Sequence, residues 1–344
     1  MTTTPAPAPT EPTSAHETAA HKIWDAVVVG GGVAGLAAAL MLGRARRRVL
    51  VLDAGAPRNR FTTHMHGVLG RDGTSPARLL ADGRDEVASY GGAVRPAEVV
   101  DATADERSVT VTTSDGDTHR ARHLVVATGL RDELPAVEGL ARFWGRGVAH
   151  CPYCDGYEAR DQRLVVLGTG PASIGQAQLI RQWSDRLTYV VHDAPAPTGE
   201  ELAALEARGI GVERGRAVRA DTTLGPDGER LAALVLDDGR PLDVDAVFTA
   251  PAPRPGDDLL LRLGAERASA GAGPGGPLPG QVPVDMLGRT TVPRVWAAGN
   301  VVAAYANVPV AIAAGTMAGA GVNHALVEEE VAAAVAARAA TVAG

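Results

Sequence analysis

Two cysteines, Cys151 and Cys154, are the only cysteines among the 344 residues, and Asp155 follows them directly. A disulfide at this spacing closes a ring too small to remove much chain entropy, so a structural role is disfavoured. Thiol–disulfide exchange is favoured instead, because a stabilised thiolate is a good leaving group. The sequence Cys-Pro-Tyr-Cys-Asp therefore predicts a redox-active pair, with Asp155 moving the proton that exchange requires. The alternative for Asp155 is a plain surface turn.

Zinc binding and an inert reduced pair are the two other interpretations of these cysteines. Structural zinc needs four ligands, and the chain offers no second cysteine pair to complete a tetrahedral site. We therefore expect no metal. A Cys-x-x-Cys pair flanked by strand–helix–strand patterns is typical of a cytoplasmic dithiol/disulfide centre.

A glycine-rich turn near the N-terminus matches a dinucleotide-binding fingerprint. Gly30, Gly32 and Gly35 follow a buried strand that begins at residue 25, and Asp53 ends the next strand. These glycines allow a tight turn, approach of a pyrophosphate and close helix packing, while a carboxylate at Asp53 would bind ribose hydroxyls. The fingerprint favours FAD or NAD over NADP, although a glycine turn without a ligand is the alternative. The expected cofactor contacts here are Gly30, Gly32, Val33, Ala34, Gly35, Asp53 and Ala54.

Three later segments are predicted to complete this cofactor site. Residues 55–73 lack periodicity and are interpreted as a loop over the cofactor, after which Ser75 should cap a helix over residues 76–90. Residues 124–129 and 295–301 are short buried strands that end in small residues, which let backbone approach a ligand. The candidate contacts are Arg58, Asn59, His66, Gly67, Ala127, Thr128, Gly129, Gly299 and Asn300.

A second strand, glycine turn and helix follow the cysteines at residues 163–180. This turn departs from the fingerprint, because Ser173 replaces the third glycine. His192-Asp193 and prolines follow the next strand, without the arginine cluster that a 2′-phosphate requires. We expect a helix over 200–208, strands over 212–220, 231–236 and 245–249 in one sheet, a Gly/Pro-rich loop over 271–283, and a small-residue helix over 310–327 with Glu328–Glu330 at its solvated end.

Composition excludes several classes of partner. The net charge of −7 and the pI near 5.7 give no electrostatic reason to expect nucleic acid or an anionic membrane. Residues 1–21 are rich in Thr, Pro and Ala and lack an apolar run, so we expect a disordered tail and not a signal peptide. No stretch approaches the ~20 uninterrupted apolar residues of a membrane span, so a cytoplasmic protein is expected.

Five motifs together resemble the low-molecular-weight thioredoxin reductase family: GGGVAG at 30–35, ATG at 127–129, CPYCD at 151–155, GTGPAS at 168–173 and AAGN at 297–300. The resemblance implies an α/β fold with two Rossmann-like domains and a homodimer. It implies a discontinuous FAD-binding domain at 22–132 and 254–331, a pyridine-nucleotide-type domain with the cysteines at 133–253, and a tail at 332–344.

The same resemblance assigns roles to the redox residues. Cys154 falls at the flavin-facing sulfur, Cys151 at the substrate-facing sulfur, and Asp155 at the acid that serves the substrate-side thiol. Two positions depart from thioredoxin reductases proper: their basic HRRxxxR motif for NADPH is absent after residue 191, and their Gly-Asp near the flavin is Gly299-Asn300. This pattern looks like the branch of FAD-dependent dithiol oxidases that close disulfides in natural products such as gliotoxin and holomycin.

Our hypothesis from the sequence is an FAD oxidase that converts a small-molecule dithiol to its disulfide, with O2 as acceptor and H2O2 as product. Side chains near Cys151 that could shape its pocket are His150, Phe143, Trp144 and Tyr153. His150 is the alternative base to Asp155. A reductase of thioredoxin fed by NADPH or ferredoxin, and a flavin redox sensor that binds a partner, are the competing functions.

Overall fold

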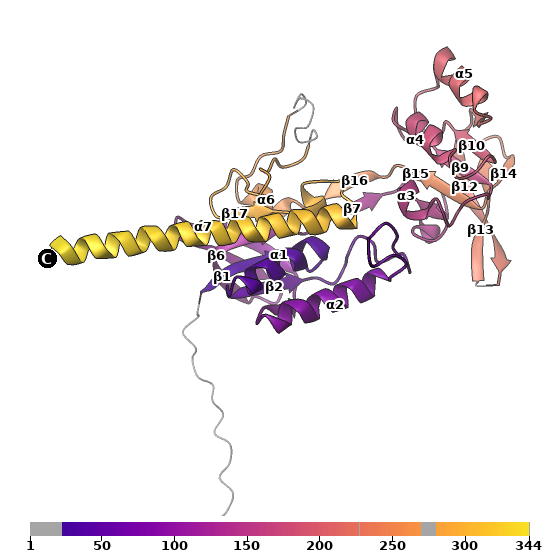
Figure 1. Ribbon diagram of the computed structural model, residues 1–344. Coiled ribbons are helices and arrows are strands. Elements are labelled where there is room, and N and C mark those ends of the chain that lie inside the picture. The colour runs from indigo at the N-terminus through magenta and orange to yellow at the C-terminus, as the bar shows by residue number, and fades with distance from the viewer. Residues whose placement is uncertain (1–22, 227, 270–279, 344) are drawn as a thin grey trace, which may run out of the picture.

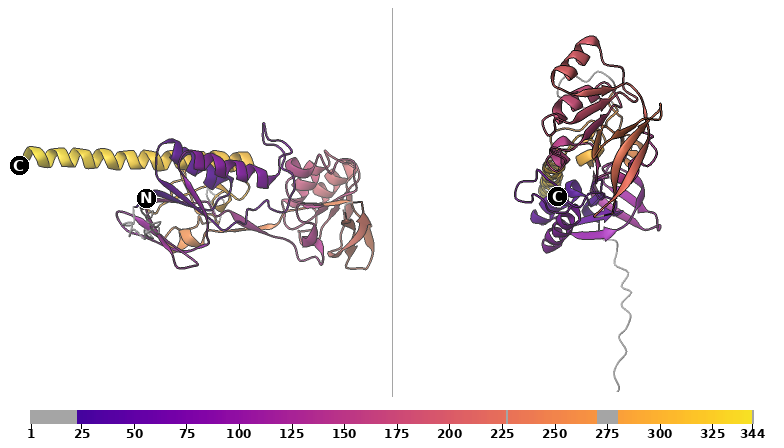
Figure 2. Two further views of the ribbon diagram at one scale, coloured as in Figure 1. Left: turned by 90° about the horizontal axis from the view of Figure 1, so that it is seen from below. Right: turned by 90° about the vertical axis from the view of Figure 1, so that its right-hand side faces the viewer.

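The apolar strand that precedes the first glycine turn lies at the centre of a seven-stranded sheet. The computed structural model describes residues 23–226, 228–269 and 280–343, and it has two lobes joined by a narrow ribbon (Figures 1 and 2). The strand order is β3-β2-β1-β6-β5-β4, with β17 pairing with the far end of β6. The strands are β1 (Trp24–Val29), β2 (Val49–Asp53), β3 (Ala93–Pro96), β4 (Val99–Ala104), β5 (Val109–Thr113), β6 (Thr118–Val126) and β17 (Val295–Ala297).

Alternate residues of the parallel strands face two cores, which explains why these strands are continuously apolar. Val28 contributes to the core on one face, under α1, α2 and α7, and Val27 contributes to the core on the other, with α6. The helices are α1 (Val33–Arg44), α2 (Pro76–Ser89), α6 (Asp258–Arg262) and α7 (Val308–Ala343), with the 3-10 turn η2 (Gly299–Val301). As predicted, Ser75 caps α2, since its hydroxyl accepts a hydrogen bond from the Arg78 amide at 3.2 Å.

The second lobe contains a five-stranded parallel sheet in the order β11-β10-β9-β15-β8 and a separate antiparallel sheet, β12-β13-β14. The parallel strands are β8 (Val148–Ala149), β9 (Leu164–Leu167), β10 (Leu187–Val190), β11 (Gly211–Glu213) and β15 (Ala246–Thr249). The others are β12 (Ala217–Gly225), β13 (Gly228–Leu236) and β14 (Pro241–Asp243), and the helices are η1 (Leu140–Phe143), α3 (Pro152–Asp155), α4 (Ser173–Ile180) and α5 (Gly199–Ala207).

Two antiparallel strands, β7 (Leu130–Glu133) and β16 (Ala252–Pro255), form the ribbon between the lobes. The domain boundaries expected at 132/133 and 253/254 fall inside this ribbon, and the division into domains stays a prediction. We call the described residues within 23–129 and 256–343 the first lobe and those within 134–251 the second lobe.

Three expectations about elements are wrong. The strand expected over 212–220 is two strands in different sheets, β11 and β12, because Arg214–Arg216 turn the chain between them. Strand β13 pairs in the antiparallel sheet and not beside β15. The helix expected to end at 327 continues to Ala343, through the segment predicted to be a tail.

The glutamates near the middle of α7 also differ from expectation. Glu329 is not at a solvated helix end, because it pairs with Arg122 at 2.8 Å, with Arg294 at 2.5 Å and with His123 at 3.2 Å. Glu330 pairs with Arg47 at 2.5 Å. These two carboxylates therefore hold α7 against β6 and the segment before β2. The expected tail over 1–21 and most of the loop over 271–283 lie outside the described residues.

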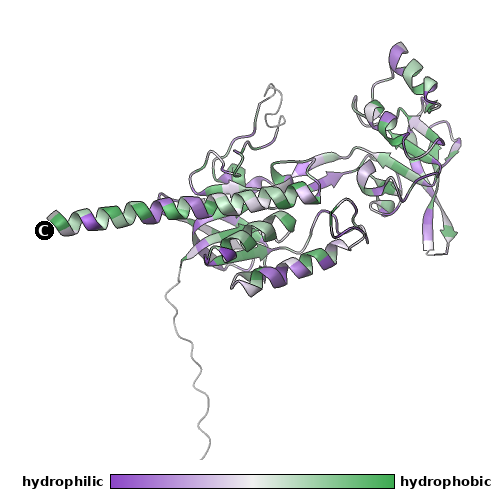
Figure 3. Cartoon of the chain, in the orientation of Figure 1, coloured by the Kyte–Doolittle hydropathy of each residue, from purple (hydrophilic) through white to green (hydrophobic). Residues whose placement is uncertain are grey.

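Helix α7 has two different halves. Its first half packs on α1, whereas residues 331–342 are exposed and project beyond the lobe, and they are mainly valine and alanine with a single arginine (Figure 3). By length and composition alone the helix could cross a membrane, with a mean hydropathy of 1.4 in its most apolar window. The same composition suits a core helix, which is the role of its first half.

Candidate functional site

The two cysteines form a disulfide at the start of the short helix α3. Cys151 is the residue before the helix, and its carbonyl accepts hydrogen bonds from the amides of Cys154 at 3.1 Å and Asp155 at 3.2 Å. Pro152 occupies the first helical position, where a missing N–H costs nothing. The Cα atoms of the disulfide lie 5.3 Å apart. The local sequence thus dictates the turn that brings both sulfurs together.

Position 156, directly after Asp155, accommodates only glycine. A Cβ there would collide with the Pro152 carbonyl and lie 2.9 Å from the Trp183 ring. Trp183 also meets Tyr153 edge to face, with ring centroids 5.8 Å apart. Helix α3 is therefore held against a fixed aromatic side chain.

Asp155 is a carboxyl with an unusual proton affinity. Burial, and to a lesser extent the charge of Glu158, raises the pKa of Asp155 to about 6, and His66 opposes this shift. A carboxyl with this pKa exchanges protons near neutral pH, as a proton carrier for thiols must. This pKa is compatible with the predicted role of Asp155 as a proton carrier, which stays a prediction.

His150, the alternative base, is held by the second lobe. Its Nδ1 lies 3.2 Å from the Thr249 carbonyl, and its ring lies 6.5 Å from the Tyr305 ring of the first lobe. Burial lowers the pKa of His150, so its neutral form is favoured. The protonated Nδ1 of the neutral imidazole therefore donates a hydrogen bond to the Thr249 carbonyl.

Phe143, Trp144 and Tyr153 were also expected to shape a pocket beside Cys151, but Phe143 does not reach the surface there. Phe143 is fully buried in the core of the second lobe, and Trp144 packs against the same core. Tyr153 is exposed beside Trp183.

The first glycine turn fits a dinucleotide. Gly30 has a φ of +104°, and a Cβ there would collide with the Ala127 carbonyl. A Cβ on Gly32 would meet nothing within 4 Å, so the backbone before α1 is open to a ligand. The Asp53 carboxylate lies against Gly31, as a ribose contact requires. These residues fit FAD, whose pyrophosphate would lie at the N-terminus of α1.

Some of the other predicted cofactor contacts lie beside this turn, but Thr128, Arg58, Asn300 and His66 have partners within the protein. Ala127–Gly129 follow β6, beside the turn after β1, and the Thr128 hydroxyl donates to the Gly256 carbonyl at 2.6 Å. Arg58 makes a bidentate ion pair with Asp132 at 2.7 and 2.8 Å and donates to the Ala304 carbonyl at 3.0 Å.

Asn300 and His66 both contact the protein itself. The Asn300 amide donates to the carbonyls of Ala303, Ala304 and Ala306. His66 contacts Glu158 in the second lobe. Asn59 and Gly67 lie on the loop between β2 and α2, and Ala54 follows β2.

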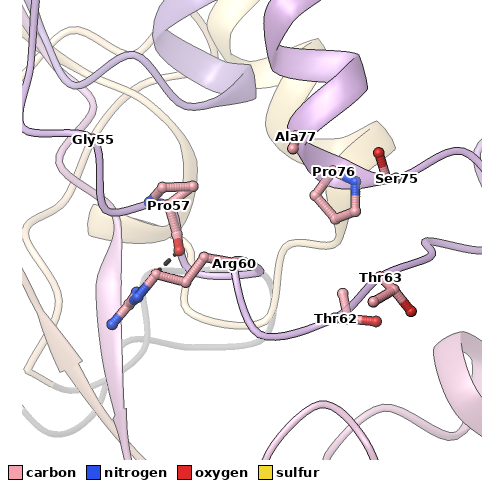
Figure 4. Close-up of a pocket in the computed structure, with 8 residues that line it drawn as sticks. All are labelled: Gly55, Pro57, Arg60, Thr62, Thr63, Ser75, Pro76 and Ala77. Atoms are coloured by element: carbon pink, nitrogen blue, oxygen red, sulfur yellow. Dashed lines mark hydrogen bonds between the residues drawn. The ribbon is translucent and has the colours of Figure 1, made fainter. Parts of the chain in front are cut away.

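An open hollow of about 590 Å³ lies between this loop and the N-terminus of α2, bordered by Arg60 and two threonines (Figure 4). Neither cysteine lines it. Its complete lining is Gly55, Pro57, Arg60, Thr62, Thr63, Ser75, Pro76 and Ala77.

The second glycine turn is closed by its own serine. The Ser173 hydroxyl accepts hydrogen bonds from the amides of Thr169 at 3.0 Å and Gly170 at 3.3 Å, and Ser173 is buried. These amides would otherwise face a pyrophosphate. Asp193, after β10, forms an ion pair with Arg216. The sequence did not predict an arginine beside Asp193, because Arg216 comes from a later segment of the chain.

Several residues of the site were missed by sequence reasoning. Asp132 and Tyr305 reach the site from segments far from the cysteines. Glu158 lies three residues after Asp155 and Asp72 lies on the loop of His66, but the contact of His66 with Glu158 joins segments far apart in the chain, so no local spacing marks it. Among the described residues, no group of three or more His, Cys, Asp or Glu side chains could hold a metal ion.

The fold and the disulfide define a two-lobed dinucleotide-binding oxidoreductase. Residues 24–315 match the model of the pyridine nucleotide-disulphide oxidoreductase family, and the chain belongs to this family. It is similar to thioredoxin reductase tcpT of Claviceps purpurea (strain 20.1), with 31% identity over 86% of this chain and 92% of the relative. It is also similar to thioredoxin reductase sirT of Leptosphaeria maculans, with 30% identity over 88% and 94%.

Solved structures confirm the thioredoxin reductase-like fold. The crystal structure of HlmI is 42% identical, with a TM-score of 0.84, over 93% of this chain and 98% of that chain. The thioredoxin reductase TrxB from Bacillus anthracis is 26% identical, with a TM-score of 0.81, over 89% and 99%. The predicted α/β fold with two Rossmann-like units is therefore confirmed.

Proposed function

We propose that this protein is an FAD-dependent oxidase that converts a small-molecule dithiol to its disulfide through Cys151 and Cys154, with O2 as the electron acceptor. The observation that carries the proposal is the closed second glycine turn. Ser173 occupies the amides that would bind the pyrophosphate of a nicotinamide nucleotide, and Arg216, the cation beside Asp193, is already paired with that carboxylate. With this route disfavoured, a substrate dithiol is the electron donor.

The disulfide chemistry balances without a further reactant. One substrate thiolate attacks Cys151 Sγ, and Cys154 leaves as a thiolate; the second substrate thiolate then attacks the mixed disulfide and releases Cys151. The substrate loses two electrons and two protons, and Asp155 carries a proton away from the substrate-side thiol. Bound FAD, held by Gly30–Gly35 and Asp53, would accept the two electrons and pass them to O2, which leaves with two protons as H2O2.

The test is oxygen consumption with a panel of small dithiols and with thioredoxin, each with and without NADPH. We expect dithiol-dependent oxygen uptake with one H2O2 per disulfide, unaffected by NADPH. Cys151→Ser and Cys154→Ser should each abolish turnover while FAD stays bound. Retained oxidase activity in both variants would refute the scheme.

A thioredoxin reductase is the second candidate, because the curated relatives tcpT and sirT carry that name. Anaerobic mixing separates the two functions. Rapid bleaching of the flavin by NADPH would favour the reductase, and bleaching by dithiols alone would favour the oxidase. Many turnovers with stoichiometric H2O2 would exclude a sensor that cycles once. The cytoplasmic location and the homodimer are likewise proposals.

A further inference from the structure

His66 makes a contact between the lobes that cofactor binding does not explain. Its Nδ1 lies 3.3 Å from an Asp72 carboxylate oxygen on its own loop, and its Nε2 lies 3.5 Å from a Glu158 carboxylate oxygen of the second lobe. The other Asp72 oxygen accepts a hydrogen bond from the Gly67 amide at 3.0 Å. The loop therefore presents the imidazole to Glu158 in a fixed orientation.

Glu158 lies in the turn that follows the disulfide helix, three residues after Asp155. The Ala159 amide donates to the Asp155 carbonyl at 3.1 Å, so the turn that carries Glu158 is continuous with α3. Within the part of the chain that the structure describes, Glu158 and His66 are the charged groups that act on the Asp155 carboxyl. Asp72 faces His66 from the other side.

We propose that His66 is a positioning residue of the disulfide centre: it joins Asp72 to Glu158, holds the turn behind Cys154 and offsets the charge that Glu158 places beside Asp155. This inference rests on the proposed role of Asp155 as proton carrier. It differs from the expectation that His66 contacts the cofactor.

The direction of the effect follows from the charges. A protonated His66 favours the carboxylate form of Asp155, which is the form that accepts a proton from a thiol. The Glu158 carboxylate opposes that form. His66 and Glu158 therefore act on Asp155 with opposite signs, and a purely structural contact would give both variants the same effect.

The experiment measures reduction of the Cys151–Cys154 disulfide by dithiothreitol in the anaerobic holoenzyme. Thiols are trapped by alkylation and counted by mass spectrometry between pH 5 and 8, and rates are divided by the concentration of protonated dithiothreitol, the species from which Asp155 would take a proton. The variants are His66→Gln and Glu158→Gln. His64→Gln is the control, because His64 lies on the same loop and contacts Thr63 Oγ1 at 2.9 Å.

We expect the wild-type rate to rise with pH through an inflection near the pKa of Asp155, about 6. His66→Gln should move the inflection to higher pH and lower the rate at pH 6 about threefold, with little change at pH 8. Glu158→Gln should move the inflection to lower pH, and His64→Gln should leave it in place. Equal slowing by both variants at every pH, or two unmoved profiles, would overturn the proposal.

A second measurement covers variants whose disulfide is reduced too slowly to follow. NMR titration of the Asp155 carboxyl carbon in the oxidised protein should give the same two opposite shifts without turnover, and an unshifted carboxyl in His66→Gln would count against the proposal. Neither experiment uses O2 or NADPH. Failure of the oxidase would appear in the oxygen assay, whereas failure of the His66 proposal appears here.

Discussion

At Asn300, the side-chain nitrogen that distinguishes asparagine from aspartate makes the hydrogen bonds of this position. Thioredoxin reductases carry an acid at this place, whereas the Asn300 amide donates to three carbonyls, of Ala303, Ala304 and Ala306, at 2.9 to 3.3 Å. A carboxylate has no hydrogen to donate and would face three carbonyl dipoles. The amide therefore shapes the loop that carries Tyr305 toward His150.

Asn300→Asp should consequently destabilise this loop. Loss of the donated hydrogen bonds should lower the free energy of unfolding by about 2 kcal/mol and weaken FAD retention. Thermal unfolding and the flavin-to-protein absorbance ratio after gel filtration measure the two effects. Asn307→Asp is the matched control, because Asn307 Oδ1 only accepts, from the Val310 amide at 3.2 Å. Equal stability of the two variants would contradict this account.

At the scale of elements, the contact between α1 and α7 determines how the glycine turn is supported. Gly315 lies so close to α1 that a Cβ there would collide with the Ala34 carbonyl. Gly319 has the same relation to Ala38, one turn further along. Small residues on α7 thus let the two helix backbones touch directly behind the predicted pyrophosphate site.

Gly315→Ala should push the helices apart, at a cost of about 3 kcal/mol in unfolding free energy. Because Ala34 lies in the first turn of α1, we expect weaker FAD binding as well. Gly175→Ala is the control, since Gly175 is also helical but a Cβ there meets nothing within 4 Å. This control should gain roughly 1 kcal/mol from helix propensity. Denaturant unfolding of both variants tests the contrast.

Elements defined by local sequence were predictable. The glycine turn, the strand that ends at Asp53 and the helix capped by Ser75 each follow from neighbouring residues. The break between β11 and β12 was not predictable, because the residues on both sides of it have the sequence of a strand. Only the fold shows that β11 belongs to the parallel sheet and β12 to the antiparallel sheet. Glu329 was expected in solvent because its partner Arg122 is 207 residues away. At the site, Glu158 was missed for the same reason.

At the scale of the whole molecule, the two lobes are connected by little more than the ribbon and a few contacts. Arg58 reaches from the first lobe to Asp132 in the ribbon, Gly145 lies against the backbone of Phe61, and His66 meets Glu158. All three contacts in the first lobe come from the loop between β2 and α2. This loop thus connects the cofactor turn, the ribbon and the disulfide helix.

Stability of the whole chain should depend on pH through a histidine far from the disulfide. His123 is buried, its Nδ1 accepts a hydrogen bond from the Trp296 indole at 3.2 Å, and its Nε2 lies 3.2 Å from Glu329. Burial lowers the pKa of His123 to about 4, although the charge of Glu329 opposes this shift. Because Nδ1 accepts from Trp296, the neutral imidazole carries its proton on Nε2, the nitrogen that faces Glu329.

Between the ordinary pKa near 6.5 and the native value near 4, only the unfolded chain binds a proton at His123. The stability linked to this group is therefore complete above about pH 6.5 and declines as the pH falls toward 4, by up to about 3 kcal/mol. His123→Gln should be less stable at pH 7 but should lose less stability than the wild type over this range. Urea unfolding at half-unit pH steps gives the comparison, with the exposed His324→Gln as control. Parallel pH curves for wild type and His123→Gln would place the acid sensitivity in other groups.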